Sequence, residues 1–433
     1  MPAPSPSLLR AFRHRNYRLF FSGQSVSLVG TWVTRIATSW LVYRLTGSAW
    51  WLGVVGFVGQ LPTLLLAPVA GVLVDRWDRH RILVATQLLS MLQSAALAAL
   101  AFAGRLSVTH ILWLQALQGV INAFDTPARQ AFVVQMVEDR ADVPNAIALN
   151  SSMFNGSRIV GPAIGGALLA ATGEGWCFAL DAASYLAVIA SLLAMRLTAT
   201  PVRRRGDEGV ASVGAELREG LHYALGFPPV RSALLLVALM GLFGMPYTTL
   251  MPAVASDVLH GGPHTLGWLM TAGGVGALGG AFYLAGRGSV VGLGRVMSLG
   301  AAGAGLALVG FALSRSPWLS LLLMPLVGAT FMMTTASANT VLQTILPEAL
   351  RGRVMALYTV AFLGSAPIGS LLAGGIAARL GTPATILGGG LGCVAAGLWF
   401  LRVLPRLREH VRPIYVERGI LVAAAAETTN GRP

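Results

Sequence analysis

GVLVDRWDRHR, residues 71–81, joins two apolar segments of this chain and carries charges of both signs at their junction. The segments on either side, residues 50–74 and 80–102, are long enough to cross a bilayer core as helices, because roughly 20 apolar residues in helical form span about 30 Å. A junction this short requires a compact turn between the two helices. The stretch therefore predicts two neighbouring membrane spans that run in opposite directions.

Apolar segments of similar length fill the rest of the chain, which has 433 residues, 55% of them hydrophobic and 11% charged. Strands cross lipid only in a closed barrel, and the short alternating segments of a barrel are absent from the sequence. We therefore predict an all-α polytopic membrane protein with twelve transmembrane helices in two six-helix bundles. The predicted spans are residues 19–43, 50–74, 80–102, 109–130, 145–171, 176–196, 231–254, 264–285, 293–313, 318–343, 352–378 and 384–404.

Arginines indicate the orientation of these spans, because basic residues are retained on the cytoplasmic side. All 31 basic residues are arginine, and 25 of them fall in the first 18 residues, in every second loop, in the C-terminal tail and at the span ends that adjoin these regions. The opposite loops hold only Arg44, Arg105, Arg315 and Arg379. Both termini are therefore predicted to be cytoplasmic, in a protein integral to the cell (inner) membrane.

A polar stretch over residues 197–230 divides the spans six and six. It contains RRRGDEG, followed by a spacing of Val213, Leu217 and Leu221 that predicts an amphipathic helix on the cytoplasmic surface. We predict an N-terminal bundle over residues 1–196, this linker, a C-terminal bundle over 231–404 and a cytoplasmic tail over 405–433.

An internal repeat supports the division into two halves. Sliding the chain by 208 residues aligns span 5 with span 11 and gives nine identities in 26 positions, among them Gly161/Gly369 and Gly166/Gly374. Secondary transporters use two repeated halves that rock about a site near the middle of the membrane.

The loop quoted above resembles the GxxxDRxGRR signature of the major facilitator superfamily. Gly71, Asp75, Arg76, Arg79 and Arg81 match it, whereas Asp78 stands where the family usually has glycine. The resemblance implies that the aspartate faces the start of span 11, residues 352–355, and that Arg79 bridges to an acid at the end of span 4, here Asp125. These residues would latch the halves together on the cytoplasmic side. The alternative is a topological anchor retained by the positive-inside bias alone.

Span 5 contains GSRIVGPAIGG, residues 156–166, which is similar to the GPxxGG antiporter signature of the drug-exporting branches of this superfamily. Gly161, Pro162, Gly165 and Gly166 match that signature. In the family, span 5 meets span 8 across the two halves, so the resemblance implies a glycine seam, for which Gly276 and Gly280 of span 8 are the expected partners. Ordinary packing of small residues is the alternative.

Further strings extend the resemblance over nearly the whole chain. Gln118 and Gly119 match the RxxQG signature of span 4, but Gln115 replaces its arginine, so the proton-coupling role of that arginine does not transfer. NAFDTPARQ in span 4 and GTWVTRIATSWLVYRLTGS in span 1 resemble the branch of enterobactin exporters and macrolide efflux proteins.

Charged residues inside spans are functional candidates, because burying a charge in lipid is expensive. Asp181, Arg35 and Arg158 are the candidate proton or charge sites. Asp181 and Arg35 fall in the same half of the membrane and are expected to be close enough to pair, and Asp181 is either a proton carrier or a neutral structural residue. Arg158 is expected to serve as a scaffold that hydrogen-bonds carbonyl groups or Asn155.

In the major facilitator fold, spans 1, 4, 7 and 10 line the central cavity. Here these spans carry neutral or polarisable side chains, which suit ligands of varied shape. Packing against neighbouring helices or lipid is the alternative for any single one. The candidate cavity residues are Gln24, Gln115, Gln118, Asn122, Met245, Tyr247, Met332 and Asn339.

Several classes of function are disfavoured. The net charge of +14 is explained by arginines dispersed over cytoplasmic loops, so no nucleic-acid partner is expected. Cys177 and Cys393 have no ligands at metal-binding spacing, so no metal or other cofactor is expected. No nucleotide-binding loop and no nucleophile motif beside a histidine occur in the sequence, which argues against an ATP-driven pump and against an enzyme.

The sequence therefore predicts a secondary active transporter that exports an amphipathic or hydrophobic small molecule, such as a drug, a siderophore or a secondary metabolite, by alternating access. Its expected partners are the substrate, membrane lipid and protons that move inward as the substrate leaves. A lipid or lysolipid transporter of the same fold is the alternative, and a receptor or structural role also stays open.

Overall fold

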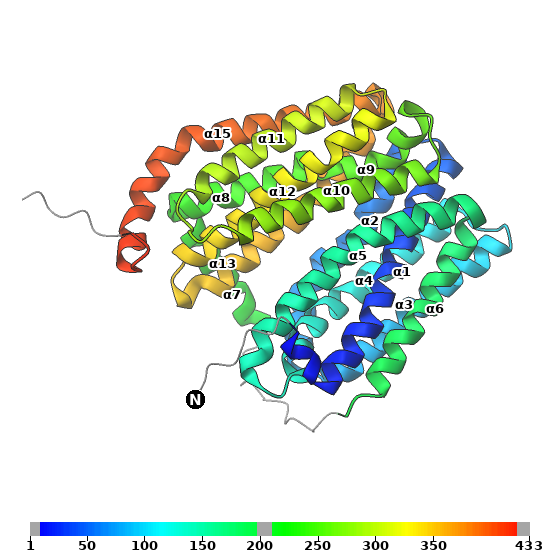
Figure 1. Ribbon diagram of the computed structural model, residues 1–433, viewed down its shortest axis with the longest axis horizontal. Helices are drawn as coiled ribbons and strands as arrows, with labels where there is room; N and C mark the ends of the chain where they lie inside the picture. Colours follow the sequence, from blue (N-terminus) through cyan, green and yellow to red (C-terminus); the bar gives the residue numbers. More distant parts are fainter. Residues whose placement is uncertain (1–8, 197–209, 422–433) are drawn as a thin grey trace, which may run out of the picture.

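The computed structural model describes residues 9–196 and 210–421, and its regular secondary structure in these ranges is helical throughout (Figure 1). Residues 9–196 form six long helices and three short 3₁₀ turns. These are η1 (Arg10–Arg13), α1 (Arg15–Thr46), α2 (Ala49–Arg76), α3 (Arg79–Phe102), α4 (Val108–Val133), η2 (Val134–Met136), η3 (Arg140–Asp142), α5 (Val143–Thr172) and α6 (Glu174–Leu193).

Residues 210–421 form a second set of helices, and three of its segments, each labelled η, are wider π turns. The elements are α7 (Val210–Gly226), α8 (Pro228–Leu239), η4 (Met240–Gly244), α9 (Pro246–Ala253), η5 (Val254–Val258), α10 (Pro263–Ala285), α11 (Leu293–Leu313), α12 (Pro317–Ile345), α13 (Glu348–Thr359), η6 (Val360–Gly364), α14 (Ser365–Leu380) and α15 (Thr382–Glu417). Turns of this kind frequently interrupt helices at functional sites.

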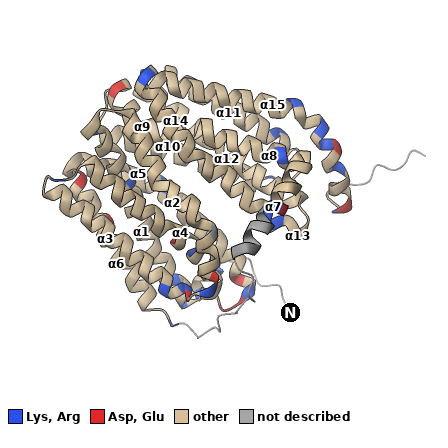
Figure 2. Cartoon of the chain, turned by 180° about the vertical axis from the view of Figure 1, so that it is seen from behind, with Lys and Arg blue, Asp and Glu red and all other residues tan. Residues whose placement is uncertain are grey.

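Nine helical segments of the described chain are long and apolar enough to cross a membrane, so this is an integral membrane protein. They include the continuous runs Pro228–Val258 and Glu348–Leu380, which contain the π turns. Helices α1, α4 and α5 coincide with predicted spans 1, 4 and 5 but are not among the nine. Helices α1 and α4 carry Gln24 and Gln118, two of the predicted cavity residues. Figure 2 shows most of the charged residues near helix ends, with mostly uncharged residues along the helices between them.

Two groups of helices follow from the packing. In the N-terminal group, residues 9–196, α1 packs on α5 and α6, α3 on α4 and α6, and α2 on α4. In the C-terminal group, residues 228–421, α12 packs on α10 and α11, and α11 on α15. The groups lie side by side in Figure 1 and meet through two main pairs, α5 with α10 and α2 with α14.

The turn between α2 and α3 explains the departure from the family pattern at Asp78. This residue caps α3, because its carboxylate accepts hydrogen bonds from the backbone N–H groups of His80 at 2.9 Å and Arg81 at 3.2 Å. Aspartate is among the best residues at such a position. Asp78 therefore caps α3 at the position where the family usually has glycine.

The last helix extends beyond residue 404, the predicted end of the last span. Helix α15 continues to Glu417 despite Pro405 and Pro413. Leu404, Leu407 and Tyr415 are buried against the C-terminal group, so packing outweighs the cost of the two prolines. The predicted linker helix exists as α7, which packs on α13. The arginines of RRRGDEG lie outside the described residues.

Candidate functional site

The contact between α5 and α10 is a backbone-to-backbone approach that only glycine permits. A Cβ atom at Gly166 would lie 2.8 Å from the Pro263 carbonyl oxygen and 2.9 Å from the Gly267 Cα. A Cβ at Gly267 would lie 2.6 Å from the Pro162 carbonyl oxygen. The hydroxyl of Thr271 donates to the Ile159 carbonyl oxygen at 3.1 Å on the same seam. Part of the GPxxGG motif therefore forms a contact between the two groups.

The other half of that motif faces a different helix from the one predicted. Positions Gly161 and Gly165 pack on α1, against Trp32 and Val33, because they lie one residue, about 100° of helix, before the face that meets α10. The expected partners Gly276 and Gly280 also differ, since they pack on α12. The seam on α10 is formed instead by Gly267 and Gly274.

The contact between α2 and α14 repeats the same geometry. A Cβ at Gly374 would lie 2.8 Å from the Ala49 carbonyl oxygen and 2.9 Å from the Gly53 Cα. Gly374 is the residue that aligns with Gly166 in the internal repeat. The repeat thus places one glycine of each group against the backbone of the other, at the ends of the helices opposite the loop of residues 71–81.

A third contact closes the same end of the molecule. The hydroxyl of Tyr43, at the end of α1, donates to the carboxylate of Asp257 in η5. Nearby, Arg44 forms an ion pair with Glu174 at 3.2 Å. Tyr43 lies in the stretch of span 1 that carries the family resemblance, but no pattern in the sequence pairs it with Asp257, so this bond was not predicted.

The expected latch residues are arranged differently at the opposite end. Asp75 is exposed and pairs with Arg79, one helical turn away, at 3.0 Å. Arg81 lies 3.8 Å from Asp78, and Arg76 is exposed. A Cβ at Gly352 would meet no atom within 4 Å, so Asp75 does not cover this position of α13.

Asp125 is buried, and its carboxylate has hydrogen-bond and ion-pair partners within the N-terminal group of helices. It accepts hydrogen bonds from Thr86 at 2.9 Å and Gln87 at 2.7 Å, and it pairs with Arg129 at 3.3 Å. The predicted bridge from Arg79 to Asp125 is therefore not formed in this structure, because each residue has a partner in its own helical turn or on the neighbouring helix.

Asp181 is buried in the centre of the N-terminal group, with 1% of its surface exposed. Ser94 of α3 donates to one carboxylate oxygen at 2.7 Å, while the other oxygen has no hydrogen-bond partner in the described chain. A buried carboxylate with one unpaired oxygen is costly in its charged form, which favours a bound proton.

The two arginines inside spans do not pair with Asp181. The Arg35 guanidinium carbon lies 5.1 Å from the centre of the Trp32 ring. The expected pairing of Arg35 with Asp181 is not formed in the described chain, where Asp181 is enclosed by Gly30, Ser94 and its own helix. Within residues 9–196 and 210–421, Arg158 also makes none of the scaffold hydrogen bonds expected of it, and the side-chain amide of Asn155 donates to the Ser151 carbonyl oxygen.

The candidate cavity residues differ in exposure. Asn122 is exposed, Gln24 and Tyr247 are buried, and the others are half-buried. Gln118 donates to Ser90 at 3.3 Å and to Asn122 at 3.1 Å, which links α4 to α3. Gln115 lies beside Gly59 of α2, and Met245 and Met332 are half-buried on helices of the C-terminal group. Asn339 accepts a hydrogen bond from Gln343 at 2.6 Å and lines an open cavity of about 510 Å³.

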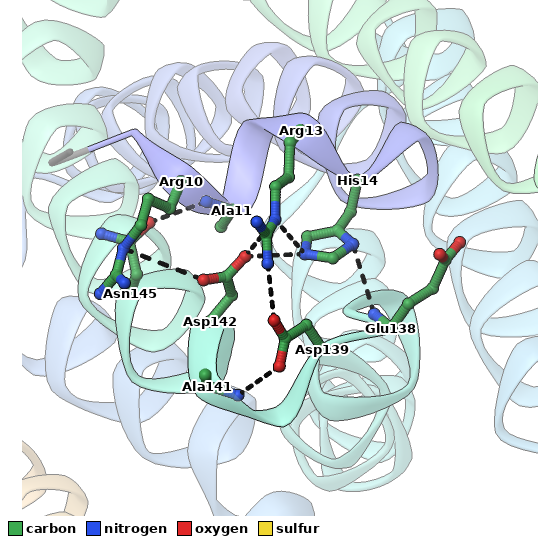
Figure 3. A network of polar contacts seen from close by, with 9 residues as sticks. All are labelled: Arg10, Ala11, Arg13, His14, Glu138, Asp139, Ala141, Asp142 and Asn145. Atoms are coloured by element: carbon green, nitrogen blue, oxygen red, sulfur yellow. Dashed lines mark hydrogen bonds and ion pairs between the residues drawn. The ribbon is translucent and has the colours of Figure 1, made fainter. Parts of the chain in front are cut away.

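A polar cluster not anticipated from the sequence fastens η1 to the segment between α4 and α5 (Figure 3). Asp142 is buried and lies 2.6 Å from Arg13 and 3.0 Å from His14. Arg13 also pairs with Asp139 at 2.7 Å. The pKa of Asp139 is lowered by the hydrogen bond from the Ala141 N–H and also by the charge of Arg13. The cluster holds the start of α1 against the start of α5.

Comparison with known protein families gives one match over nearly the whole chain. The model of the family described as transmembrane secretion effector matches residues 6–431. The multidrug efflux pump Tap of Mycolicibacterium fortuitum is 30% identical over 389 residues, which cover 88% of this chain and 93% of Tap. The staphyloferrin A transporter of Staphylococcus aureus is 28% identical and aligns over 60% of this chain and 64% of its own. The macrolide efflux protein A of Streptococcus pyogenes is also 28% identical, over 58% and 62%.

Solved structures share the fold at low sequence identity. A peptide transporter POT in complex with sulfate superposes with a TM-score of 0.72 and 14% identity over 93% of this chain and 99% of its own. A bacterial homologue of the human lysosomal transporter Spinster gives a TM-score of 0.67 and 14% identity over 96% and 99%. These relatives and structural neighbours are transporters, not enzymes.

Proposed function

This chain belongs to the transmembrane secretion effector family of major facilitator transporters, and we propose that it exports an amphipathic or hydrophobic small molecule from the cell. The molecule is of the drug, siderophore or secondary-metabolite type, a choice supported by the names of the relatives. The observation that carries a transport mechanism is the pair of repeat-related contacts, at Gly166 and Gly374, between the two groups of helices.

In an alternating-access cycle, the contacts at Gly166 and Gly374 would close one face of the transporter. We propose twelve spans in two six-helix bundles, with both termini in the cytoplasm, as the arginine distribution supports. The glycine contacts and the bond from Tyr43 to Asp257 then close the outer face, while the exposed Asp75 and open Gly352 belong to a separated inner face. Rocking of one bundle against the other would expose the central site to each side in turn.

Protons are the proposed source of energy. Asp181 is the acid best suited to bind one, because it is buried and one of its oxygens lacks a donor. A proton that moves inward across about 100 mV releases about 2.3 kcal/mol, which corresponds to roughly fiftyfold accumulation of substrate outside.

The experiment for this proposal uses purified protein in phosphatidylcholine liposomes loaded with a fluorescent amphipathic dye. An imposed pH gradient is expected to drive dye transport against its concentration gradient, and collapse of the gradient by a protonophore is expected to stop it. Transport that runs only down the dye gradient would exclude proton coupling. No protein-dependent movement of any amphipathic dye would remove the export proposal itself.

Replacement of Asp75 by asparagine tests the proposed inner latch. In the outward-open state, Asp75 is proposed to face the N-terminal end of α13, where a negative charge gains about 0.3–2 kcal/mol. The D75N variant keeps the shape of the side chain and loses that term, so transport is expected to fall several-fold at equal expression. Asp78→Asn, which retains helix capping on the same turn, serves as the control. Equal transport rates for D75N and wild type would favour the topological-anchor interpretation.

A further inference from the structure

Arg35 and Arg158 are two positive charges inside membrane spans that lack a negative partner. Neither forms an ion pair or a hydrogen bond among the described residues. Arg35 lies one helical turn after Trp32 on α1, and Arg158 lies one turn before Gly161 on α5, where Trp32 and Gly161 are in contact. The two like charges therefore repel each other across this contact. Unpaired charges at membrane depth are rare and mark the path of a substrate or ion.

The two arginines lie where the groups of helices meet. Arg158 is on α5, on the seam with α10, where its carbonyl oxygen would lie 3.1 Å from a Cβ at Gly274. Its charge also acts on Tyr247 of α9, a candidate cavity residue. The Arg35 side chain is exposed, so its guanidinium group can contact a bound molecule.

The GPxxGG motif holds one of these arginines in place. The Trp32 side chain occupies the position that a Cβ at Gly161 would take. The guanidinium of Arg35 in turn stacks over the Trp32 ring at 5.1 Å, a distance at which the ring face attracts a cation. Gly161 leaves room for Trp32, and Trp32 in turn positions the guanidinium group of Arg35. Gly161 is therefore a positioning residue for Arg35.

We propose that Arg35 and Arg158 bind an anionic group of the transported molecule, a carboxylate, sulfonate or phosphate. The guanidinium groups supply charge-assisted hydrogen bonds to the acid, and Trp32 and Tyr247 supply aromatic surface for an apolar part. An anion between the arginines neutralises two charges that repel each other when the site is empty. This inference rests on the proposed export function and narrows its substrate class to amphipathic acids.

Direct binding tests the inference without requiring transport. Full-length protein in phosphatidylcholine nanodiscs is titrated with carboxyfluorescein, an aromatic acid, and with rhodamine 6G, an aromatic cation, and fluorescence anisotropy is followed. The wild type is expected to prefer carboxyfluorescein. Arg35→Gln and Arg158→Gln are each expected to weaken that binding about tenfold or more. Arg35→Lys is expected to fall between wild type and R35Q, because it keeps the charge and loses the planar donors.

The matched control is Arg402→Gln, since Arg402 is an exposed arginine on α15, away from the contact between α1 and α5. The affinity of this variant for carboxyfluorescein is expected to match that of the wild type. Thermal unfolding gives a second readout. Removal of one of two repelling charges is expected to raise the Tm of R35Q and R158Q without ligand, whereas loss of a structural arginine would lower it. Equal or tighter binding of the cation by the wild type, or full carboxyfluorescein affinity in both variants, would overturn the inference.

Two further measurements distinguish a lipid anion from a soluble anion, and the anion-site proposal from the export proposal. Competition by a fluorescent phosphatidylglycerol analogue, but not by its phosphatidylcholine counterpart, would assign the site to a lipid headgroup and overturn the soluble acid. Transport of rhodamine without any anion preference would leave export standing and reject the anion site. Arginine-dependent binding of carboxyfluorescein without any transport would support the site and reject export.

Discussion

Replacement of Gly166 or Gly374 by alanine is expected to reduce transport by ten- to hundredfold while leaving the helices folded. Each new methyl group would lie within 3 Å of backbone atoms of the opposite group, which do not rotate away as a side chain does. Overpacking of this kind costs about 1–3 kcal/mol, and about 1.4 kcal/mol changes a conformational population tenfold. The cost is imposed only on the conformation in which the outer ends touch, so the population shifts toward their separation.

Labelling measures that shift directly. In a Ser370→Cys background, the cysteine would be buried on α14 beside Gly53 of α2, and its reactivity toward a membrane-impermeant maleimide from outside is expected to rise when Gly166 or Gly374 becomes alanine. The native cysteines, Cys177 and Cys393, are buried and give a low background. Gly156→Ala on α5 is the matched control, because a Cβ there meets no atom within 4 Å. Unchanged labelling and transport in G166A and G374A would show that the glycine contacts do not gate the outer face.

Replacement of Asp181 by asparagine is the second change with a large expected effect. The amide has the same shape and cannot exchange a proton, so uphill transport driven by a pH gradient is expected to be lost. Exchange of labelled for unlabelled dye across the membrane requires no net proton movement and is expected to continue. The same liposomes therefore measure coupling and conformational cycling separately.

Ser94→Ala is the companion variant for this test. It removes the hydroxyl that donates to Asp181 at 2.7 Å and leaves the carboxyl group in place. Because the hydrogen bond favours the charged form, S94A is expected to retain proton-driven transport and to shift its pH profile upward. Persistent pH-driven accumulation by D181N would assign proton binding to another residue. Loss of dye exchange as well would indicate a structural role for the carboxylate.

The family and the helical fold could be predicted from the sequence because both depend on local patterns. Apolar runs identify spans, and arginines beside them mark loops, irrespective of which helices touch. The repeat was equally visible, and it correctly aligned Gly166 with Gly374, two residues that make equivalent contacts. A short motif such as GPxxGG also signals close packing on its own.

The partners of these residues were harder to predict, since they depend on helix rotation and on conformation. A rotation of about 100° separates the face of Gly161 from that of Pro162, and the sequence alone did not assign the faces to α1 and α10. The bridge expected from Arg79 to Asp125 depends on the relative position of helices, and here each residue has a nearer partner. The cluster around Asp142 joins residues more than 120 positions apart without any motif.

Helix α15 is long enough that a label near its end would report movement of the C-terminal group of helices. At 1.5 Å per residue its 36 residues extend about 54 Å, against a hydrocarbon core of about 30 Å. Arg418, just beyond it, donates to the Leu346 carbonyl oxygen at 2.8 Å, and Tyr415 is buried on the same group, so the protruding part is tied to the helices below it. A spectroscopic label at Glu417 would therefore follow the tilt of that group, and its spacing from a second label at Arg15 would report each turnover from outside the substrate path.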